Sequence, residues 1–418
     1  MLDIGIIGAG IGGLSAALAL TRASPSSTIT IFEKSQFRNE TGAAIIIGPN
    51  GTRILSRWGF DFAQAGALDY LQMRRIKADT IEEDSTEQFE GIEGLYGARW
   101  LMFHRADLHA GLTRLIREQS ERIHLRLGEA VEGVDPEEGT ITLSDAGIVQ
   151  KDLLIIADGA HSNLISTIIG RNYPVIKSPM SMYRFLQPMN SILANPQTRQ
   201  FYHNQPSGFT TFYKSEVGRP GLLLNTYPCR GGELLYAALL HPTKPKERDV
   251  EGWDSPASIQ DILDDAKGFH PSVRAICEGA TDVKVYRNMW RDPVETLVKS
   301  RAILIGDAAH LMLPTHGQGA SQALEDAMAL EVLFDKSTKS DDVPHRAQLF
   351  NKLRVPRVSA VQTISNKMMG SPDKMISEVK RYYDRPVPGP GAKTFSKEYN
   401  DFFFLYDVAE EARKILRL

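Results

Sequence analysis

The sequence predicts an α/β fold: a Rossmann-like dinucleotide-binding domain that carries an inserted, mainly β domain and ends in C-terminal helices. Three observations predict it. A glycine-rich turn joins an apolar strand to an Ala/Leu-rich helix at the start of the chain, and two later apolar runs end in Asp-Gly and Gly-Asp. The stretch from 174 to about 277 is instead rich in aromatic and turn residues. Strands alternating with helices indicate a parallel sheet, whereas closely spaced strands and turns indicate an antiparallel one.

The composition is that of a globular protein of two or three domains, with 418 residues, of which 42% are hydrophobic and 24% are charged. The formal charge of −3 leaves no basic excess, which argues against nucleic acid as a partner. Cys229 and Cys277 are too few for a disulfide framework or a thiolate metal site. No apolar run is long enough to cross a membrane. We therefore expect a soluble, cytoplasmic protein with no metal.

The first 34 residues predict one βαβ unit. Residues 2–7 and 28–32 are short runs rich in isoleucine and threonine, and the helix over 14–20 lies between them. In the turn before the helix, Gly8 permits a tight bend, Gly10 lets the backbone approach a pyrophosphate, and Gly13 lets helix and strand pack closely. Glu33 ends the second strand, where its carboxylate can accept hydrogen bonds from ribose hydroxyls but would repel a 2′-phosphate. The unit therefore suits FAD or NAD rather than NADP.

The remaining elements predict the domain boundaries. Acidic residues over 79–93 indicate a solvated hairpin or loop at a sheet edge. A helix is expected over 106–119, short strands over 123–156, and a buried strand over 302–305 before a helix over about 319–334. We expect the dinucleotide-binding domain to comprise 1–75, 99–172 and 278–340, the inserted substrate domain to comprise 76–98 and 173–277, and the C-terminal helical region to comprise 341–418.

Two motifs distinguish between the cofactors. Residues 153–162 form a buried strand that continues into Asp158-Gly159-Ala-His-Ser, and residues 302–310 form another that ends in Gly-Asp307-Ala-Ala-His. The second continues through Pro314 and Gly317-Gln-Gly319 into a helix. These motifs resemble the single-component (group A) FAD-dependent aromatic hydroxylases of the salicylate hydroxylase and p-hydroxybenzoate hydroxylase type. The resemblance runs from residue 3 to about 362.

The resemblance implies non-covalent FAD. Asp307 would bond the ribityl chain, and the turn through Gly317, Gly319 and Ala320 would face the pyrophosphate and the pyrimidine edge of the flavin, where helix N–H groups stabilise negative charge. The resemblance places Gly42, Ala43 and Ala44 along the isoalloxazine, and Arg105 in contact with the cofactor, the alternative being that Arg105 caps a surface helix.

The reductant in this family is NADPH or NADH, bound transiently in a groove of the FAD domain. The chain has no second glycine fingerprint for a separate nicotinamide domain, and Asp158 would serve both FAD and the nicotinamide encounter. One position departs from the family pattern: Ile165 stands where an arginine usually follows the Asp-Gly motif.

On the substrate side, Tyr183-Arg184 and Tyr227-Pro228 resemble family pairs on the substrate-domain sheet, and Tyr213 lies where some members place a catalytic tyrosine. A cation lowers the pKa of a phenol, and the phenolate is the better nucleophile. We therefore expect Arg184, Tyr213 and Tyr227 to be catalytic. The alternative for the tyrosines is that they are strand aromatics that pack the sheet. His310 is expected to be structural or a polar group near the flavin.

The function implied by the resemblance is NAD(P)H- and O₂-dependent hydroxylation of a phenolic or other electron-rich aromatic compound through a flavin C4a-hydroperoxide, with decarboxylation or dearomatisation for suitable substrates. Aryl acids, neutral polyphenols, indoles and polyketides all remain open as substrates, and a monomer or homodimer is expected. The rivals are an FAD-dependent halogenase, whose Trp-x-Trp-x-Ile-Pro signature is absent, another flavin oxidase, and a non-catalytic flavin-binding redox sensor.

Overall fold

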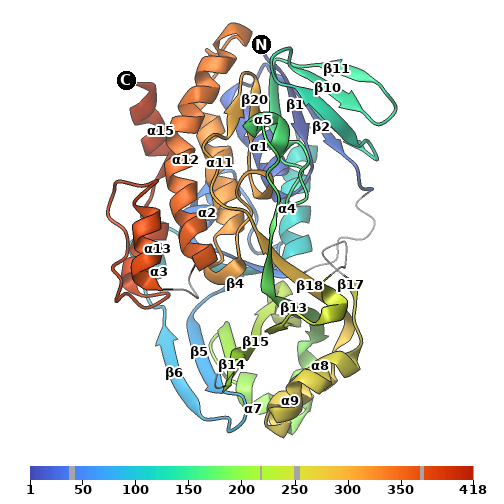
Figure 1. Ribbon diagram of the computed structural model, residues 1–418, viewed down its shortest axis with the longest axis vertical. Helices are drawn as coiled ribbons and strands as arrows, with labels where there is room; N and C mark the ends of the chain where they lie inside the picture. The colour runs from blue at the N-terminus through green and yellow to red at the C-terminus, as the bar shows by residue number, and fades with distance from the viewer. Residues whose placement is uncertain (37–42, 120, 217–218, 249–254, 368–370, 418) are drawn as a thin grey trace.

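The computed structural model describes residues 1–36, 43–119, 121–216, 219–248, 255–367 and 371–417. Two parts follow one another along the long axis of the molecule (Figure 1). The part that carries both termini consists of helices around a mainly parallel sheet, and the other part is built on a larger, mostly antiparallel sheet. The structure therefore has the predicted α/β architecture.

The central strands of the parallel sheet are apolar and buried on both faces. Its central strand pairs in parallel with a neighbour on each side, as a buried Rossmann-like sheet does. Residues 153–156 on the neighbouring strand are all fully buried. Its strand order is β19 (Val298–Lys299), β20 (Ala302–Leu304), β12 (Leu153–Ile156), β1 (Asp3–Ile7), β2 (Thr28–Glu33) and β8 (Ile123–Leu127).

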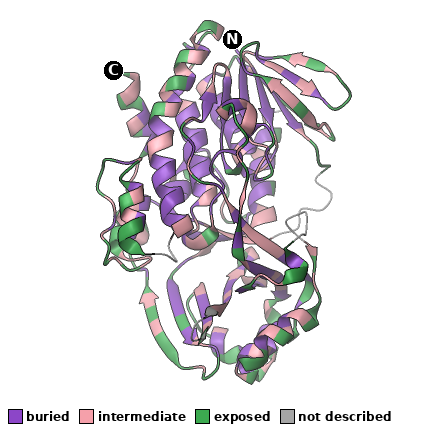
Figure 2. Ribbon diagram, in the orientation of Figure 1, coloured by how far each residue is buried: buried purple, intermediate pink, exposed green. Residues whose placement is uncertain are grey.

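Helices pack closely on this sheet because their facing residues are small. Helix α1 (Ile11–Ala23) buries an Ala/Leu face against α11 (Gly319–Leu333), and both begin at a glycine-containing turn. Figure 2 shows that the buried residues concentrate in these helices and in the parallel sheet. The other helices of this part are α2 (Pro49–Arg57), α4 (Arg105–Arg117), α5 (Ile165–Ile169), α10 (Asp307–His310), α12 (Val343–Lys367) and α15 (Val408–Leu416).

The second part is one eight-stranded sheet. Its strand order is β17 (Ser255–Pro256), β18 (Thr281–Trp290), β13 (Ile176–Pro188), β16 (Leu234–Pro242), β15 (Arg219–Cys229), β14 (Gly208–Glu216), β5 (Gln72–Lys77) and β6 (Glu83–Gln88). The acidic stretch includes β6, which lies at the sheet edge and is mostly exposed, as expected for a solvated hairpin. Helices cover one face of the sheet: α6 (Met189–Ala194), α7 (Pro196–Tyr202), α8 (Ile259–Asp265) and α9 (Pro271–Glu278).

The smaller elements connect these layers. A three-stranded sheet of β3 (Ala44–Ile47), β7 (Leu101–His104) and β4 (Leu68–Asp69) lies between the two parts, and a second one contains β9 (Val131–Asp135), β10 (Thr140–Leu143) and β11 (Ile148–Gln150). The remaining helices are α3 (Ile92–Tyr96), α13 (Pro372–Val379) and α14 (Lys397–Phe404), with short 3₁₀ turns η1 (Arg230–Gly232), η2 (Pro245–Glu247), η3 (Ala266–Gly268), η4 (Pro314–His316) and η5 (Ser340–Asp342).

Two predicted boundaries fall inside the eight-stranded sheet. Its hairpin begins at Gln72, not at 76, and β18 continues it from Thr281 to Trp290, beyond the predicted end at 277. The sequence pattern missed both because the chain passes between the two parts at β5 and at β18, and its composition does not change at either point. The division into domains otherwise stays a prediction.

Candidate active site

The glycine turn before α1 has room for a ligand at one position and none at two others. Gly8 has φ +97°, and a Cβ atom there would lie 2.4 Å from the Ala157 carbonyl oxygen. A Cβ atom on Gly13 would lie 2.0 Å from the Gly8 carbonyl oxygen, so helix and strand pack as closely as glycine allows. Among the described residues, no atom lies within 4 Å of a Cβ atom built on Gly10. The turn thus fits a pyrophosphate that approaches the backbone at Gly10.

Glu33 ends β2 beside this turn. Its Oε2 accepts a hydrogen bond from the Ala9 N–H at 2.8 Å, and its Oε1 accepts one from the Ser35 N–H at 2.7 Å. Each carboxylate oxygen can accept more than one hydrogen bond, so these contacts orient the carboxylate and still leave it able to accept from ribose hydroxyls. His109, which sequence reasoning missed, bonds the Ala9 carbonyl through its Nε2 at 2.8 Å and holds the other side of the turn.

Asp307 lies at the second strand end. It begins α10 directly after Gly306, which has φ +59°, and its side chain is exposed although the residues around it are buried. The surrounding protein desolvates the Asp307 carboxyl and raises its pKa, while His310, Arg105 and Arg291 oppose that rise. A Cβ atom on Gly319, at the start of α11, would lie 3.9 Å from Asp307 Oδ1. The fold therefore brings Asp307, Arg105 and the α11 N-terminus together.

The predicted flavin loop runs along β3. Ala44 pairs with His104 of β7, and the Arg105 N–H donates to the Ala43 carbonyl oxygen at 2.9 Å, so the loop and the backbone of Arg105 are fixed to each other. Gly317 has φ +62° and faces Ile46 of β3. Ala320 lies in the first turn of α11 and is half-buried. Gly42 lies outside the described residues.

Asp158 follows β12, and the structure places an unforeseen cation near it. Burial raises the pKa of the Asp158 carboxyl to about 6, and its Oδ1 is buried without a hydrogen-bond partner among the described residues. The charge of Arg291, which is 3% exposed, acts on Asp158 and on Asp307. Its Nη2 donates to the Ser162 carbonyl oxygen at 3.3 Å. Arg291 thus places a positive charge near the Asp-Gly motif, where Ile165 stands in place of the arginine of the family pattern. Arg291 follows the end of β18, 126 positions beyond Ile165 in the chain.

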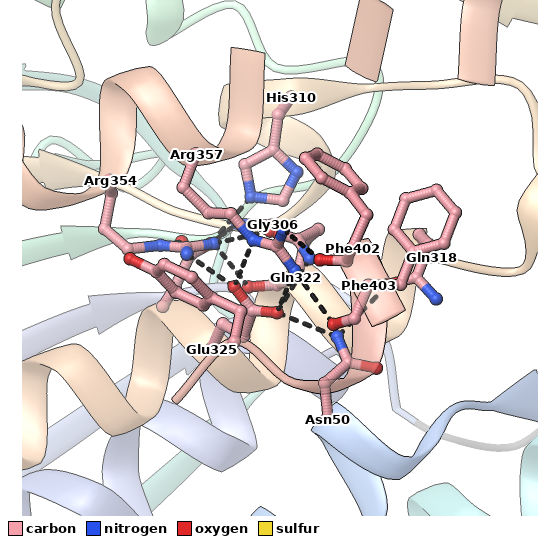
Figure 3. A network of polar contacts seen from close by, with 12 residues as sticks. Asn50, Gly306, His310, Gln318, Gln322, Glu325, Arg354, Arg357, Phe402 and Phe403 are labelled. Carbon is pink, nitrogen blue, oxygen red and sulfur yellow. Dashed lines mark hydrogen bonds and ion pairs between the residues drawn. The ribbon is translucent and has the colours of Figure 1, made fainter. Parts of the chain in front are cut away.

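A buried ionic network holds the Asp307 turn in place (Figure 3). Asp326 of α11 accepts hydrogen bonds from the Gly306 N–H at 2.9 Å and from His310 Nε2 at 2.7 Å. Arg354 of α12 donates to Asp326 at 2.8 Å and to Glu325 at 2.7 Å. His310 is therefore a structural residue, one of the two roles expected for it.

The same network reaches the start of α2 and the C-terminal segment. Glu325 accepts hydrogen bonds from Asn50 Nδ2 at 2.8 Å and from Arg357 Nη2 at 3.2 Å, and Asn50 also donates to Gln318 Oε1. Arg357 in turn donates to the Phe402 carbonyl oxygen at 2.9 Å. Burial alone would raise the pKa of Glu325, but the two guanidinium groups lower it, so the pair of carboxylates stays ionised.

The two faces of the eight-stranded sheet have different partners. Tyr183 packs on the helix-covered face, where it stacks on His241 with ring centroids 4.2 Å apart. Because side chains alternate along a strand, Arg184 points the other way, to the face shared with Tyr227 and Tyr236. Those two tyrosines belong to the core of the FAD-binding part, with ring centroids 4.8 Å apart. The predicted Tyr183-Arg184 pair is thus divided between the faces.

Arg184 lies between two of the places where this sheet touches the FAD-binding part. At one end, Tyr227 and Tyr236 join the main core, and at the other, Met289 packs with Ala160 and Leu311. Arg184, half-buried, stacks its guanidinium 4.5 Å from the ring centroid of Tyr286, and among the described residues no carboxylate pairs with it. Its positive charge opposes the rise in pKa that burial gives Tyr227 and Tyr236.

Tyr213 lies apart from these residues. It pairs with Leu223, four residues from Tyr227, which corresponds to about 13 Å along the strand, and its strand is three strands away from that of Arg184. Arg75 stacks on its ring at 4.9 Å. In the register, Tyr213 and Tyr227 each lie two residues from the level of Arg184, on opposite sides of it, but Tyr227 is two strands away and Tyr213 is three. The catalytic roles of Arg184, Tyr213 and Tyr227 stay predictions.

Comparison with known proteins agrees with this geometry. The FAD binding domain family matches residues 1–362. An FAD-dependent monooxygenase, cfoG, of Aspergillus candidus is 32% identical over 431 residues, covering 100% of this chain and 95% of that protein. Hispidin-3-hydroxylase of Neonothopanus nambi is 28% identical over 424 residues, covering 99% and 96%. A salicylate hydroxylase substrate complex shares the fold with a TM-score of 0.75 at 23% identity, covering 99% of this chain and 98% of that one.

Among the described residues, no helix is long and apolar enough to span a bilayer. Both cysteines are buried and unpaired, and burial raises the pKa of each thiol to about 12.

Proposed function

This chain belongs to the FAD-binding domain family and is an FAD-dependent monooxygenase, and from that premise we propose that it hydroxylates a phenol or another electron-rich aromatic compound. The observation that carries the proposal is Arg184: a half-buried guanidinium on the sheet face toward the FAD-binding part, stacked on Tyr286 and without a carboxylate partner among the described residues. Such a cation favours the ionised form of a bound phenol.

The residues that would hold FAD are those of the two strand ends. Gly10 and the α1 N-terminus would take the pyrophosphate, Glu33 the adenosine ribose, and Asp307 the ribityl chain, with Arg105 beside it. The chemistry supplied by bound FAD is acceptance of a hydride from NAD(P)H and activation of O₂ for transfer of one oxygen atom to the substrate. Asp158 and Arg291 would meet the nicotinamide nucleotide at the third strand end.

Arg184 would act on the substrate by electrostatics. A phenolate oxygen next to the guanidinium is stabilised, so the ring carbons ortho and para to it become more nucleophilic. Asn225 would be a second donor on the same face: Thr211 donates its hydroxyl to Asn225 Oδ1 at 2.9 Å, which orients the amide N–H groups away from that contact. In the strand register, Ala238 lies between Arg184 and Asn225. The two donors therefore stand on either side of a position where the sheet carries only a methyl group.

Tyr227 would serve as a neutral hydrogen-bonding and packing residue rather than as a base. Burial raises its pKa well above the ordinary value, so its hydroxyl keeps its proton at neutral pH. Phe209 stacks on it with ring centroids 5.4 Å apart, and Tyr236 covers its other side. The packed rings of Phe209, Tyr227 and Tyr236 would exclude water from one end of the site. Tyr213 is not part of the proposed site.

The test is a screen of aromatic compounds for faster NAD(P)H oxidation by the purified protein, with product mass measured under ¹⁸O₂. The first probes are hispidin and 3-amino-4-hydroxybenzoate, because relatives of this chain are named for acting on them. One ¹⁸O atom per product molecule is expected. NAD(P)H oxidation that no aromatic compound accelerates would contradict the proposal. We also propose that the enzyme works in the cytoplasm as a monomer or homodimer, which gel filtration with light scattering would test.

A further inference from the structure

The tip of one hairpin of the eight-stranded sheet is tied to the FAD-binding part. Turn η1 joins β15 to β16, and its first residue, Arg230, has φ +50°, an uncommon conformation for a residue with a side chain. The Gly231 N–H donates to the Gly66 carbonyl oxygen at 2.8 Å. A Cβ atom on Gly66 would lie 2.9 Å from the Gly231 nitrogen, so the two backbones approach more closely than side chains would allow.

The Arg230 side chain extends from this tip to the start of α4. Its Nε donates to Asp107 Oδ2 at 2.8 Å and its Nη2 donates to Asp107 Oδ1 at 2.9 Å, a two-pronged ion pair. Burial alone would raise the pKa of Asp107, but the hydrogen bond and the positive charge of Arg230 lower it. Asp107 also lies in the first turn of its helix, where a negative charge is favoured.

A third contact includes the last residue of β7. Arg230 Nη2 lies 2.8 Å from His104 Nδ1, and because a guanidinium can only donate, Nδ1 must accept. His104 is therefore the neutral tautomer with its proton on Nε2. His104 is 4% exposed and pairs with Ala44 of the predicted flavin loop, and the next residue in the chain is Arg105.

We propose that Arg230 is a positioning residue for the monooxygenase reaction: together with Asp107 and His104 it fixes how closely the substrate-binding face of the eight-stranded sheet lies over the flavin. This rests on the proposed placement of FAD along β3 and of substrate near Arg184. A strained backbone persists where its surroundings fix it. The positive φ of Arg230 and the close contact between Gly231 and Gly66 therefore indicate that this contact between the two parts is held in one geometry. The reacting groups lie between this joint and the second contact of the sheet near Met289.

The experiment compares Arg230→Ala with Arg274→Ala as a matched control. Arg274 is a similarly exposed arginine of the same part, ion-paired within helix α9 to Glu278, on the face away from the flavin. FAD content, amide hydrogen exchange over 62–68 and 228–234, and NADPH oxidation to peroxide without any aromatic compound are measured for both variants. None of these needs the substrate to be known.

The expected result for Arg230→Ala is wild-type FAD content, faster exchange in both segments, and peroxide formation raised at least about threefold, because water reaches the flavin when the sheet is less closely held. Arg274→Ala should behave as wild type. The double variant Arg230→Asp with Asp107→Arg, which restores opposite charges, should reverse part of the rise. If Arg230→Ala does not fold, Arg230→Lys replaces it, since it keeps the charge and loses the two-pronged geometry.

Unchanged exchange and peroxide formation in a flavin-containing Arg230 variant would overturn the proposal. An equal rise in Arg274→Ala would overturn it as well, because the effect would then be general loosening. Wild-type protein that binds FAD but oxidises NAD(P)H with no response to aromatic compounds would instead contradict the proposed function, and it would leave the exchange result on Arg230 standing.

Discussion

The arginines in the two halves of the candidate site differ in burial and in charge pairing. In the FAD-binding part, Arg354 and Arg357 are at most 1% exposed and are matched by the carboxylates of Glu325 and Asp326 (Figure 3). On the sheet face, Arg184 is half-buried and has an aromatic ring as its neighbour, with no carboxylate partner among the described residues. A buried charge that is already paired holds a structure together, whereas a charge that is left unneutralised is available to a ligand.

This comparison predicts that substitutions in the two halves separate stability from activity. The first half should respond in the free energy of unfolding and in FAD retention, and the second in turnover. The variants below run from the largest expected effect to the smallest.

The largest effect is expected for Arg354→Met. It leaves Glu325 and Asp326 buried with one cation fewer, and breaking a buried ion pair from one side costs about 3–5 kcal/mol. Thermal unfolding followed by circular dichroism would measure the loss. The control is Arg171→Met, because Arg171 pairs with Glu295 on the surface, where both side chains are more than half exposed. A control that loses as much stability would remove the distinction between buried and exposed pairs.

Arg184→Ala should leave stability and FAD content near those of the wild type. With a proven substrate, product formation should fall about thirty- to a thousand-fold, since losing a cation opposite a phenolate costs about 2–4 kcal/mol. Arg184→Lys should recover part of the rate because the charge survives. Wild-type turnover in Arg184→Ala would move the search to Tyr227 and Asn225. Tyr213→Phe is the matched negative control and should be nearly silent.

Asp307→Ala and Glu33→Ala should each weaken FAD retention. Each removes a charged hydrogen-bond acceptor for a cofactor hydroxyl, worth about 1.5–3 kcal/mol, or about ten- to a hundred-fold in affinity. Flavin released on gel filtration at low micromolar protein is the measurement, and acid precipitation should release wild-type flavin intact because the cofactor is not covalently linked. Full flavin occupancy in Asp307→Ala would contradict the assignment of the second strand end.

The smallest effect concerns the pH dependence of stability. Because the folded-state pKa of Asp158 is raised to about 6, the folded protein holds this proton more tightly than the unfolded chain, whose ordinary value is 3.8. The stability from this group is therefore present below about pH 4 and is lost as the pH rises through 6. Asp158→Asn should flatten the melting temperature of flavin-free protein between pH 4 and 7. If the melting temperature of the variant changed with pH as steeply as that of the wild type, the pKa of Asp158 would not be raised in the folded protein.

The cofactor half was predictable from the sequence because its determinants are local. A strand, a turn and a helix N-terminus within 34 residues place Gly8, Gly10, Gly13 and Glu33 together whatever the rest of the chain does, and Asp307 follows its own strand in the same way. The buried partners of that half were not predictable, because Glu325 and Asp326 meet Arg354 only when α12 packs on α11.

The substrate half needed the tertiary structure. Which face a strand residue occupies follows from alternation once one neighbour is known, but which residues of eight strands lie side by side depends on strand order and register. The strand order places Tyr213 three strands away from Arg184. Arg291 near Asp158, and Arg230 on Asp107, join residues more than 120 positions apart. The sequence alone thus determined the fold class, the cofactor and, through the family resemblance, the reaction class, because these rest on short motifs. The tertiary structure decided which side chains share the sheet face toward the FAD-binding part, because long-range packing sets their positions.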